Sequence, residues 1–448
     1  MHHTGKKFQT RSRTLRWVAV AVSTAIALAG CATNGGAPAG KTVLTVQIAT
    51  GDGIAKMNQA FAAGFEKKNP NVTIKFVHSP DDNVNVPVLT GNNAPDVGMA
   101  PLNEDTTKAM ADNGDLVNLG PAWKAADLDT RYPAGVSDSA LYGGKHYAIS
   151  TNVLYYSFAY YNKDLFEKAG ITIPANHRIA SSKDLYDISA KLNKIGKQGL
   201  AVGGGTGYQP SWLIDALLPT AATPQQMTNY LSNWQKGVKP TVSYTDGPFV
   251  KTLQQLKDYA DNGVFQKGFA GITDLAAVEA SFVSQQSGML LDGVWYAGTL
   301  AITPPGFAYD WVLLPPVDGA KQKSQLPTLF NFSVVIPTKG KHKAVAMQYV
   351  AYITSVEAQT RGVIDAGQSI PSVTDLPASA FKSLSPAVKG MLADVAKNGS
   401  QPGWTSTVPT TYGQTFSTPV VQAVWSGSDT PRSAGAKVQA EYKSVTGN

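Results

Sequence analysis

Two carboxylates follow predicted strands, at loop positions where reactive groups often gather. They are Asp52 and Asp292, and a pair of carboxylates is all that glycoside hydrolysis requires of a protein. The sequence cannot place these two side chains at the separation that hydrolysis needs. Acidic residues are scarce elsewhere in the chain, and most fall on predicted helix surfaces. Solvated or helix-capping carboxylates are therefore favoured over a catalytic pair.

The histidines and the glycine-rich stretches predict no metal or cofactor. The four histidines beyond the N-terminus show no metal-ligand spacing with one another or with carboxylates; they are His78, His146, His177 and His342. The patterns G-x-S-x-G and H-E-x-x-H do not occur. The stretch GGGTG at 203–207 does not fit a dinucleotide fingerprint, and it favours a flexible turn over phosphate binding. We expect no cofactor, no metal and no catalytic residue.

Aromatic residues follow turn signals at several places along the chain. They are Tyr208, Trp212, Trp295, Tyr296 and Trp404. A flat ring can cover the apolar C–H face of a sugar, while Asp, Asn and Gln side chains bind the hydroxyl groups at its rim. The polar partners that we expect are Asp52, Asn103, Gln209 and Asp292. Core packing explains any single tryptophan equally well, but the set together favours a neutral, hydroxyl-rich ligand.

The elements that position these residues alternate between strand and helix. An alternating strand at 43–49 is followed by a helix with apolar positions at Met57, Phe61 and Phe65, and then by a second strand at 72–78. This βαβ unit favours a parallel sheet with a right-handed crossover. The full chain of 448 residues is longer than one core usually serves, so we expect two lobes.

The net charge of +7 comes mainly from the N-terminus. Five basic residues and no acidic residue precede Cys31, and without those five the chain has 33 basic against 31 acidic residues, or +2. A nearly neutral body gives no reason to expect nucleic acid or an anionic membrane surface as a partner.

The first thirty residues have the features of an export signal. A basic segment precedes the apolar run WVAVAVSTAIAL at 17–28, which is too short to span a bilayer comfortably. The run ends in LAGC, which resembles the lipobox of bacterial lipoproteins, whose cysteine receives a diacylglycerol. Cys31 is the only cysteine, so a disulfide within the chain is impossible. We expect a signal peptide at 1–30 and a lipidated Cys31. An ordinary signal peptide with a chance cysteine is the alternative.

Five further stretches resemble, in order, the solute-binding proteins of ABC importers, in the family that includes the maltose-binding protein. They are FAAGFEKKNPNVTIKF, NNAPDVGMA, YYNKDLFEKAGI, SGMLLDGVWYAG and AVAMQYVAYITSVEAQ. YYNKDLFEKAGI is the most specific match. The resemblance runs from about Val43 to the C-terminus, and a lipobox suits a receptor that is tethered to the membrane.

This resemblance implies an α/β, two-lobed periplasmic-binding-protein-like fold, with a ligand cleft and a hinge between the lobes. The implied crossings lie near 152–155, 308–310 and 377–386. After a tether at 31–42, the N-terminal lobe is residues 43–153 plus 311–378, and the C-terminal lobe is residues 154–310 plus 379–448. Tyr155, and Tyr156 beside it, are expected at the hinge facing the cleft. Tyr160 and Tyr161 are expected to be buried in a strand.

The family's ligand-binding positions carry over to both lobes. They fall on Asp52, Asn103, Tyr155, Tyr208, Gln209, Trp212, Asp292, Trp295, Tyr296, Asn331 and Trp404. The first strand lacks a tryptophan that the family often has there, which leaves the identity of the ligand open.

The function that follows is saccharide binding without catalysis. We expect a monomeric receptor, anchored by lipid on the outer face of the cell membrane, that delivers a saccharide to the membrane subunits of an ABC permease. A receptor for a glycerol phosphodiester or another polar solute is the alternative, and a lysine or arginine in the cleft would favour it. Less favoured are a surface-anchored glycosidase that uses Asp52 and Asp292, and an adhesive lipoprotein without a small ligand.

Overall fold

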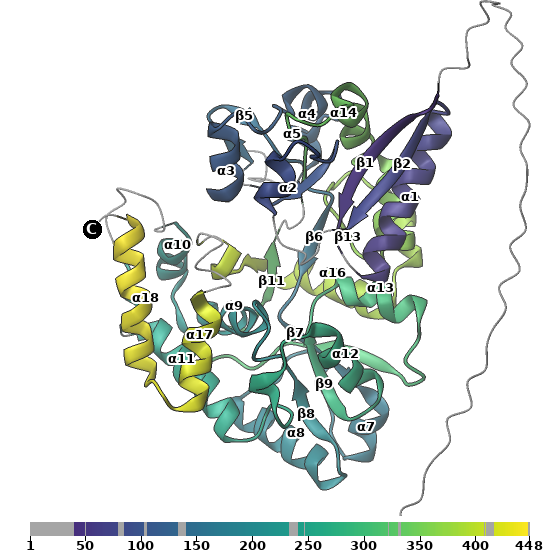
Figure 1. Ribbon diagram of the computed structural model, residues 1–448. Coiled ribbons are helices and arrows are strands. Elements are labelled where there is room, and N and C mark those ends of the chain that lie inside the picture. The colour runs from purple at the N-terminus through teal and green to yellow at the C-terminus, as the bar shows by residue number, and fades with distance from the viewer. Residues whose placement is uncertain are drawn as a thin grey trace, which may run out of the picture. The chain divides into compact units, whose positions relative to one another are not determined.

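The computed structural model divides the chain at residue 40 into two units, and the second unit carries every element described below (Figure 1). The residues described are 40–49, 51–78, 85–102, 105–132, 140–232, 241–245, 247–320, 322–329, 333–406, 408 and 416–446. Cys31, the signal peptide and nearly all of the tether lie outside these residues.

A parallel βαβ unit opens the first lobe, as the sequence predicted. Strands β1 (Thr42–Ile48) and β2 (Val72–His78) pair in parallel through the crossover helix α1 (Asp52–Lys68). The sheet continues through the residue before β3 (Gly98–Ala100), because the amide of Gln47 donates to the carbonyl of Val97 at 2.8 Å. Strand β3 in turn pairs antiparallel with β12 (Ser333–Val335).

Helix α1 forms because its apolar residues recur every four positions. Met57, Phe61 and Phe65 are all buried, and the ring of Phe65 meets the ring of Tyr349 edge-on at 5.2 Å. The remaining elements of this lobe surround the same core (Figure 1): α2 (Val86–Thr90), α3 (Asp105–Asp112), α4 (Gly120–Ala125), α5 (Leu128–Arg131), β4 (Leu141–Tyr142), β5 (Lys145–His146), α14 (Lys343–Tyr352), α15 (Val356–Ala358) and the π-helix η2 (Gln359–Ala366).

The second lobe is built on a four-stranded sheet that is buried on both faces. Its strands, in spatial order, are β10 (Tyr309–Val312), β7 (Phe158–Asn162), β9 (Ser287–Asp292) and β8 (Gln198–Ala201). Successive side chains alternate between two cores, so that Tyr161 packs on one face and Tyr160 on the other. Both tyrosines are buried, at 8% and 0% exposure, which confirms the prediction for this pair.

Helices cover both faces of this second sheet. They are α7 (Lys163–Lys168), α8 (Ser182–Lys194), α9 (Gln209–Ala221), α10 (Pro224–Ser232), α11 (Gly247–Asp261), η1 (Phe269–Gly271), α12 (Leu275–Val283), α13 (Trp295–Ile302), η3 (Ala378–Ser383), α16 (Pro386–Asn398), η4 (Trp404–Ser406), α17 (Ser417–Ser426) and α18 (Pro431–Thr446).

A third sheet lies between the elements of the two lobes (Figure 1). Its strands, in spatial order, are β13 (Ile370–Pro371), β6 (Asn152–Tyr155), β11 (Leu326–Leu329) and β14 (Ser400–Pro402). Strand β6 occupies the residues at which the family resemblance placed the first crossing. Near 308–310, where the return was expected, the structure has β10 paired with β7 in the second sheet. Strand β11, which pairs with β6, is therefore our proposed return, and the exact lobe boundaries remain a prediction.

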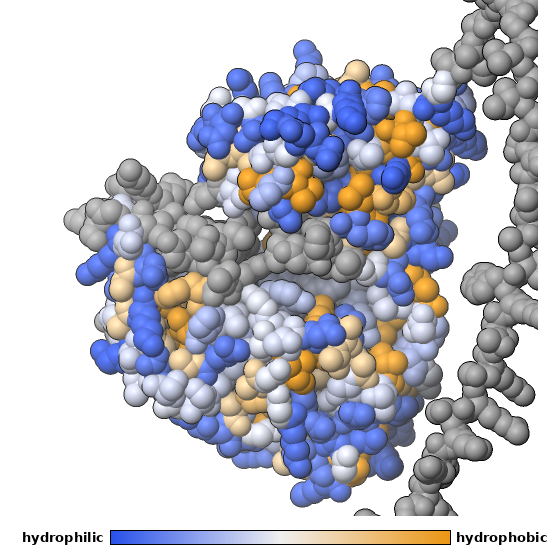
Figure 2. Space-filling model, in the orientation of Figure 1, coloured by the Kyte–Doolittle hydropathy of each residue, from blue (hydrophilic) through white to orange (hydrophobic). Residues whose placement is uncertain are grey.

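The face of the described unit that is shown in Figure 2 is mainly hydrophilic, with scattered apolar patches. Among the helices described, none combines the length and the apolar character needed to cross a bilayer.

Candidate ligand-binding site

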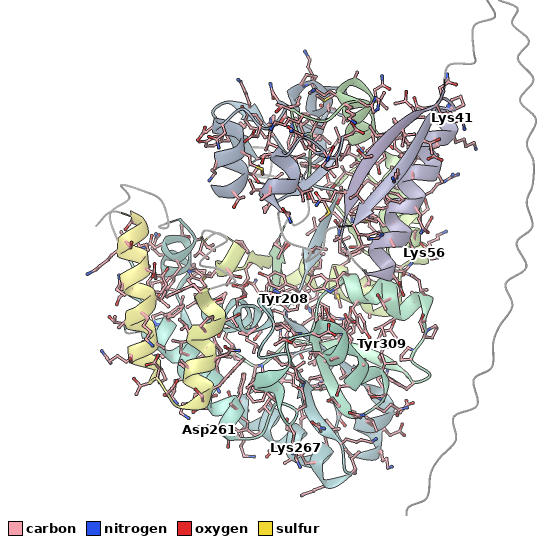
Figure 3. The ribbon with its side chains drawn as sticks, in the orientation of Figure 1. Lys41, Lys56, Tyr208, Asp261, Lys267 and Tyr309 are labelled. Atoms are coloured by element: carbon pink, nitrogen blue, oxygen red, sulfur yellow. The ribbon has the colours of Figure 1, made fainter. Side chains whose placement is uncertain are left out.

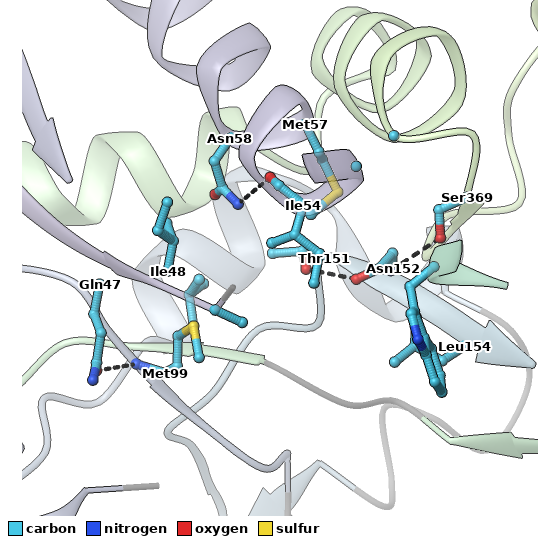
Figure 4. Close-up of a pocket in the computed structure, with 15 residues that line it drawn as sticks. Gln47, Ile48, Ile54, Met57, Asn58, Met99, Thr151, Asn152, Leu154 and Ser369 are labelled. Atoms are coloured by element: carbon cyan, nitrogen blue, oxygen red, sulfur yellow. Dashed lines mark hydrogen bonds between the residues drawn. The ribbon is translucent and has the colours of Figure 1, made fainter. Parts of the chain in front are cut away.

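A pocket lies where α1, β1 and β6 meet the first residue of α13 (Figure 4). Its lining is mostly apolar and contains Gln47, Ile48, Ala49, Gly53, Ile54, Met57, Asn58, Met99, Thr151, Asn152, Leu154, Trp295, Val334, Gly367 and Ser369. Its void volume is about 60 Å³, room for a few water molecules only.

Neutral polar side chains line this pocket and are fixed by hydrogen bonds. The Asn152 amide donates to the Ser369 hydroxyl at 3.1 Å and accepts from the Thr151 hydroxyl at 2.9 Å. The Gln47 side-chain oxygen accepts from the Met99 amide at 3.1 Å (Figure 4). No residue in the lining carries a formal charge. The pocket is thus equipped for an uncharged ligand with hydrogen-bonding groups.

Three partly exposed aromatic rings form a row that ends at the pocket. Tyr208 and Trp212 have ring centroids 4.9 Å apart at 33°, and Trp212 and Trp295 have centroids 5.2 Å apart at 60°. Trp295 also lines the pocket. Tyr208 lies at the edge of the second lobe that faces the first lobe (Figure 3). We call these three residues the aromatic row.

The order of strands in the second sheet explains why the row forms. Strands β8 and β9 are parallel neighbours, so their carboxyl ends lie at the same edge of the sheet. Trp212 lies in the first turn of α9, the helix after β8, and Trp295 is the first residue of α13, the helix after β9. Two tryptophans that are 83 positions apart in the sequence are therefore brought into ring contact.

Asp52 is the first residue of α1, and its side chain is exposed. The start of α1 approaches α13 closely through glycines, because a Cβ atom on Gly53 would lie 3.2 Å from the Cα of Gly298. The Asp52 charge also raises the pKa of Glu279 on α12. Asp52 is thus close to the aromatic row, although it does not line the pocket itself.

Asp292 lies at the carboxyl end of β9 and has no exposed surface. Burial, followed by the nearby Glu279 carboxyl, raises its pKa well above the ordinary range. Its Oδ1 atom accepts a hydrogen bond from the Gly293 amide at 2.8 Å. Asp292 therefore lies behind Trp295 and does not face the pocket.

Three other predicted site residues are buried and engaged elsewhere. The Gln209 amide accepts from Gly203 at 2.5 Å and donates to the Leu291 carbonyl at 2.9 Å. Tyr155 is buried at the hinge, where its carbonyl accepts from the amide after Gly293, and burial raises the pKa of its phenol to about 12. Tyr296 packs edge-on against another tyrosine, 6.0 Å away. None of the three lines the pocket, and these residues support the site instead of forming its surface.

Tyr156 and Trp404 also belong to the protein interior. The Tyr156 hydroxyl donates to Asp215 at 2.8 Å, inside the second lobe. Trp404 is 1% exposed, and its indole donates to the Tyr244 hydroxyl at 3.2 Å. We therefore place Trp404 in the core of the second lobe and not in the cleft. The remaining predicted residues, Asn103 and Asn331, lie outside the described residues.

The polar residues on the first-lobe side of the pocket were not predicted from the sequence. Gln47 is a buried amide in strand β1, whose other buried residues are apolar, and Asn152 begins the first crossing. A buried amide in such a strand was the available signal, because a buried polar group needs partners. Ser369 had no comparable signal, because only the fold brings it to Asn152.

The glycine-rich stretch at 203–207 does not form a phosphate site. The amides of Gly203, Gly204 and Gly205 donate to Gln209 and to two carbonyls near η1, so they are not available to an anion. Residues 35–42, GGAPAGKT, have the spacing of a phosphate-binding loop. Such a loop opens a helix, whereas Thr42 here begins strand β1. In the described part of the chain, no group of three or more metal-ligating side chains is found.

Comparison with known proteins agrees with this architecture. Residues 49–360 match the family model of the bacterial extracellular solute-binding proteins. An uncharacterized ABC transporter extracellular-binding protein of Pyrococcus horikoshii is 23% identical over 340 residues, which cover 74% of this chain and 72% of the relative.

Solved structures share the same two-lobed fold at low sequence identity. A chitin oligosaccharide binding protein superposes with a TM-score of 0.75 at 19% identity, over 91% of this chain and 100% of that chain. The GacH receptor of Streptomyces glaucescens, solved unliganded and with acarbose, gives a TM-score of 0.72 at 21% identity, over 91% and 99%. The predicted fold class, a two-lobed periplasmic-binding-protein-like α/β fold, is thereby confirmed.

Proposed function

The chain belongs to the bacterial extracellular solute-binding proteins of ABC transporters, and we propose that it binds a neutral saccharide between its two lobes. The observation that carries this proposal is the aromatic row beside an uncharged pocket. Stacked rings offer flat apolar surface, and the amides and hydroxyls of Gln47, Asn152 and Ser369 offer donors and acceptors.

The structural neighbours support the same ligand class. The two named above are, by their titles, a chitin oligosaccharide binding protein and a receptor solved with acarbose. At 19% and 21% identity these likenesses establish the fold alone. The saccharide is therefore proposed from the rings and the uncharged lining, and the neighbours agree with it.

The residue types in the pocket lining also favour a saccharide receptor over a phosphodiester receptor or a glycosidase. A phosphodiester ligand would be bound by lysine or arginine, and no lining residue is either of these. A glycosidase would need two carboxylates that reach the substrate, but Asp292 has no exposed surface. The family and its neighbours are binding proteins, and we propose that this chain likewise has no catalytic activity.

Ligand binding would favour the closed arrangement of the lobes through contacts that only that arrangement provides. The pocket suits this mechanism, because residues of α1 and β1 line it from the first lobe and Trp295 lines it from the second. Hinge closure of this kind is the usual response of periplasmic binding proteins.

The anchor and the delivery step complete the proposal. We propose that Cys31 carries lipid, that the small-residue tether holds a monomeric receptor outside the membrane, and that the closed form docks on a permease. Replacement of Cys31 by serine should release the protein from the membrane fraction. Continued membrane attachment of that variant would contradict the lipid anchor but not ligand binding.

A saccharide panel tests the proposed function. Thermal unfolding of the purified protein should shift upward with at least one mono- or oligosaccharide, by about 2.7 kcal/mol of added stability at a hundredfold excess over the dissociation constant. Glycerol phosphodiesters serve as the charged controls. A stabilising phosphodiester with no stabilising saccharide would overturn the proposal. Steady release of reducing sugar would replace it with the glycosidase.

A further inference from the structure

A second cavity, larger than the pocket beside Trp295, lies in the second lobe. It is lined by the end of α9, the start of α10, the residues that precede β11, the last residue of α16 and strand β14. Its void volume is about 410 Å³, within the roughly 300–1,000 Å³ that small-molecule sites occupy. The described structure therefore already has space for a small organic molecule at this place.

This cavity is separate from the pocket beside the aromatic row. The two share no lining residue. Helix α9 connects them, because Trp212 in its first turn belongs to the aromatic row and Pro219, seven residues further along, lines the cavity. Seven residues of α-helix span roughly 10 Å. A ligand in the cavity would therefore leave the aromatic row free.

The charged residues in the cavity lining are both basic. They are Arg178 and Lys323. The Arg178 guanidinium donates to both carboxylate oxygens of Asp394, at 2.7 and 2.9 Å, so its charge is compensated. Lys323 is exposed, and within the described chain it has no ion-pair partner. The lining thus offers one uncompensated positive charge, whereas the pocket beside Trp295 has no charged residue in its lining.

The uncharged part of the lining suits an organic molecule better than an inorganic ion. Four apolar side chains contribute to it, namely Pro219, Ala222, Pro224 and Met227. Amide side chains contribute as well, among them Gln401 on β14. The Gln401 Nε2 atom has no hydrogen-bond partner among the described residues. This amide can therefore turn toward a ligand without losing a hydrogen bond that the structure describes.

We propose that this cavity is a second binding site, which takes a small organic acid with a single carboxylate. The carboxylate pairs with the Lys323 ammonium, the Gln401 amide bonds a polar group of the acid, and the Met227 side chain contacts its carbon skeleton. A single negative charge matches the one positive charge that has no partner in the lining. The proposal does not depend on saccharide binding, because the two sites have different lining residues.

Methionine methyl groups report on the two sites separately. Met227 lines the cavity, whereas Met57 and Met99 line the pocket beside Trp295. The full chain is labelled with ¹³C at its methionine methyl groups, and methionine-to-leucine variants assign the three signals. Gluconate, galacturonate and lactate are then titrated, each beside its neutral analogue: sorbitol, galactose and propane-1,2-diol.

At least one acid should give a saturable shift of the Met227 signal that its neutral analogue does not give. If no acid shifts this signal, or if each neutral analogue shifts it equally, the proposal is overturned. Inorganic phosphate is a further arm of the titration. A saturable shift with phosphate and with none of the three acids would also overturn it, since the site would then bind phosphate.

Competition with a saccharide tests whether the sites are separate. The Met227 shift should persist when a panel saccharide saturates the protein. Displacement of the acid by that saccharide would place both in the same pocket and would contradict a second site. If no saccharide binds, the proposed function fails, while the titration with acids still decides whether the second site exists.

Two variants test the residues that are assigned to the acid. Lys323→Gln should weaken binding of the acid by about two- to fivefold, the range of an exposed ion pair. Gln401→Leu should weaken it by about two- to tenfold, the range of one hydrogen bond. Unchanged affinity in both variants would contradict the assignment.

Lys267→Gln is the matched control. Lys267 is an exposed lysine of the same lobe that lines neither site, and its replacement changes the net charge by the same amount. Its affinity for the acid should equal that of the wild type. A loss as large as that of Lys323→Gln would show that only the overall charge matters, and would overturn the role of Lys323.

Discussion

The second lobe contains two aromatic groups of similar composition and opposite exposure. In the aromatic row, the rings of Tyr208, Trp212 and Trp295 are partly exposed and make ring contacts at 4.9 and 5.2 Å. In the core group, Trp404 contacts Phe249 at 5.3 Å and Tyr244 at 5.9 Å, and all three are buried. The two groups differ in whether other residues of the chain cover the ring faces and hydrogen-bond with the indole N–H or the phenol O–H.

The comparison shows what distinguishes a stacking surface from a core. The indole of Trp404 donates to a tyrosine hydroxyl, and its faces are covered by residues far away in the sequence. The row has its own internal contacts, and all three of its rings remain partly exposed. Ring–ring contact therefore identifies both groups, and only exposure separates binding surface from packing.

The largest expected effect is on the stability of the core group. Trp404→Ala should lower the free energy of unfolding by about 3–5 kcal/mol, because it removes a fully buried aromatic side chain. Trp212→Ala, at a partly exposed position, should cost clearly less. Urea denaturation of both variants measures the difference. Equal losses would remove the distinction between the two groups.

The next expected effect concerns Asp215, which lies three residues after Trp212 on α9 and is hydrogen-bonded to the residue that follows Trp404. This buried carboxylate accepts hydrogen bonds from the Tyr156 hydroxyl and the Thr405 amide, and burial raises its pKa to about 6. The pKa of an aspartate in the unfolded chain is near 3.9. The stabilising contribution of Asp215 is therefore fully present below about pH 4 and is lost as the pH rises through 6, by at most about 3 kcal/mol.

Thermal unfolding from pH 4 to pH 8 measures this contribution as the difference between wild type and Asp215→Asn. The asparagine variant should be less stable overall but should show a flatter pH profile. A difference that does not vary with pH would show that Asp215 keeps its ordinary pKa in the folded protein.

A third prediction addresses the row itself. Trp212→Ala should weaken saccharide binding by about 1.5–3 kcal/mol, or roughly 10- to 150-fold, because a ring of this size loses its buried contact with the ligand. Trp404→Phe is the control, and its affinity per folded molecule should be unchanged. Calorimetric titration gives both values, and an effect of Trp404→Phe as large as that of Trp212→Ala would place both rings in the cleft.

The smallest expected effect is that of removing only the Tyr208 hydroxyl, which distinguishes the contribution of the ring to ligand binding from that of the hydroxyl. Tyr208→Phe keeps the ring contact with Trp212, which lies at 4.9 Å. If the ring is what the ligand uses, affinity should fall by no more than the 0.5–1.5 kcal/mol of about one hydrogen bond. Tyr208→Ala should cost more. Equal losses in both variants would assign the contribution to the hydroxyl.

Local patterns predicted the scaffold well because they depend on neighbours in the sequence. The opening βαβ unit follows from spacing and apolar runs, and the structure confirms it. The burial of Tyr160 and Tyr161, which the family resemblance implied, is confirmed as well. The return crossing could not be located in the same way. The composition of residues 309–312 would suit a strand of the second or of the third sheet, and their pairing with β7 places them in the second.

The site was less predictable because exposure depends on distant segments. Asp52 follows strand β1 and Asp292 ends strand β9, yet α12 and Trp295 cover only Asp292. Trp212 and Trp404 are the same residue type after similar turn signals, yet Tyr244 and Phe249 bury only Trp404. The spacing of residues in the sequence does not reveal which distant residues will bury a given side chain in the fold.

A crystal structure of the protein with its panel saccharide would test the central claim most directly. We predict a sugar ring lying face-on against Trp295 or Trp212, with its hydroxyls bound by uncharged side chains such as Asn152, and Trp404 still buried away from the ligand. A ligand bound elsewhere, or one held mainly by lysine or arginine side chains, would contradict the account.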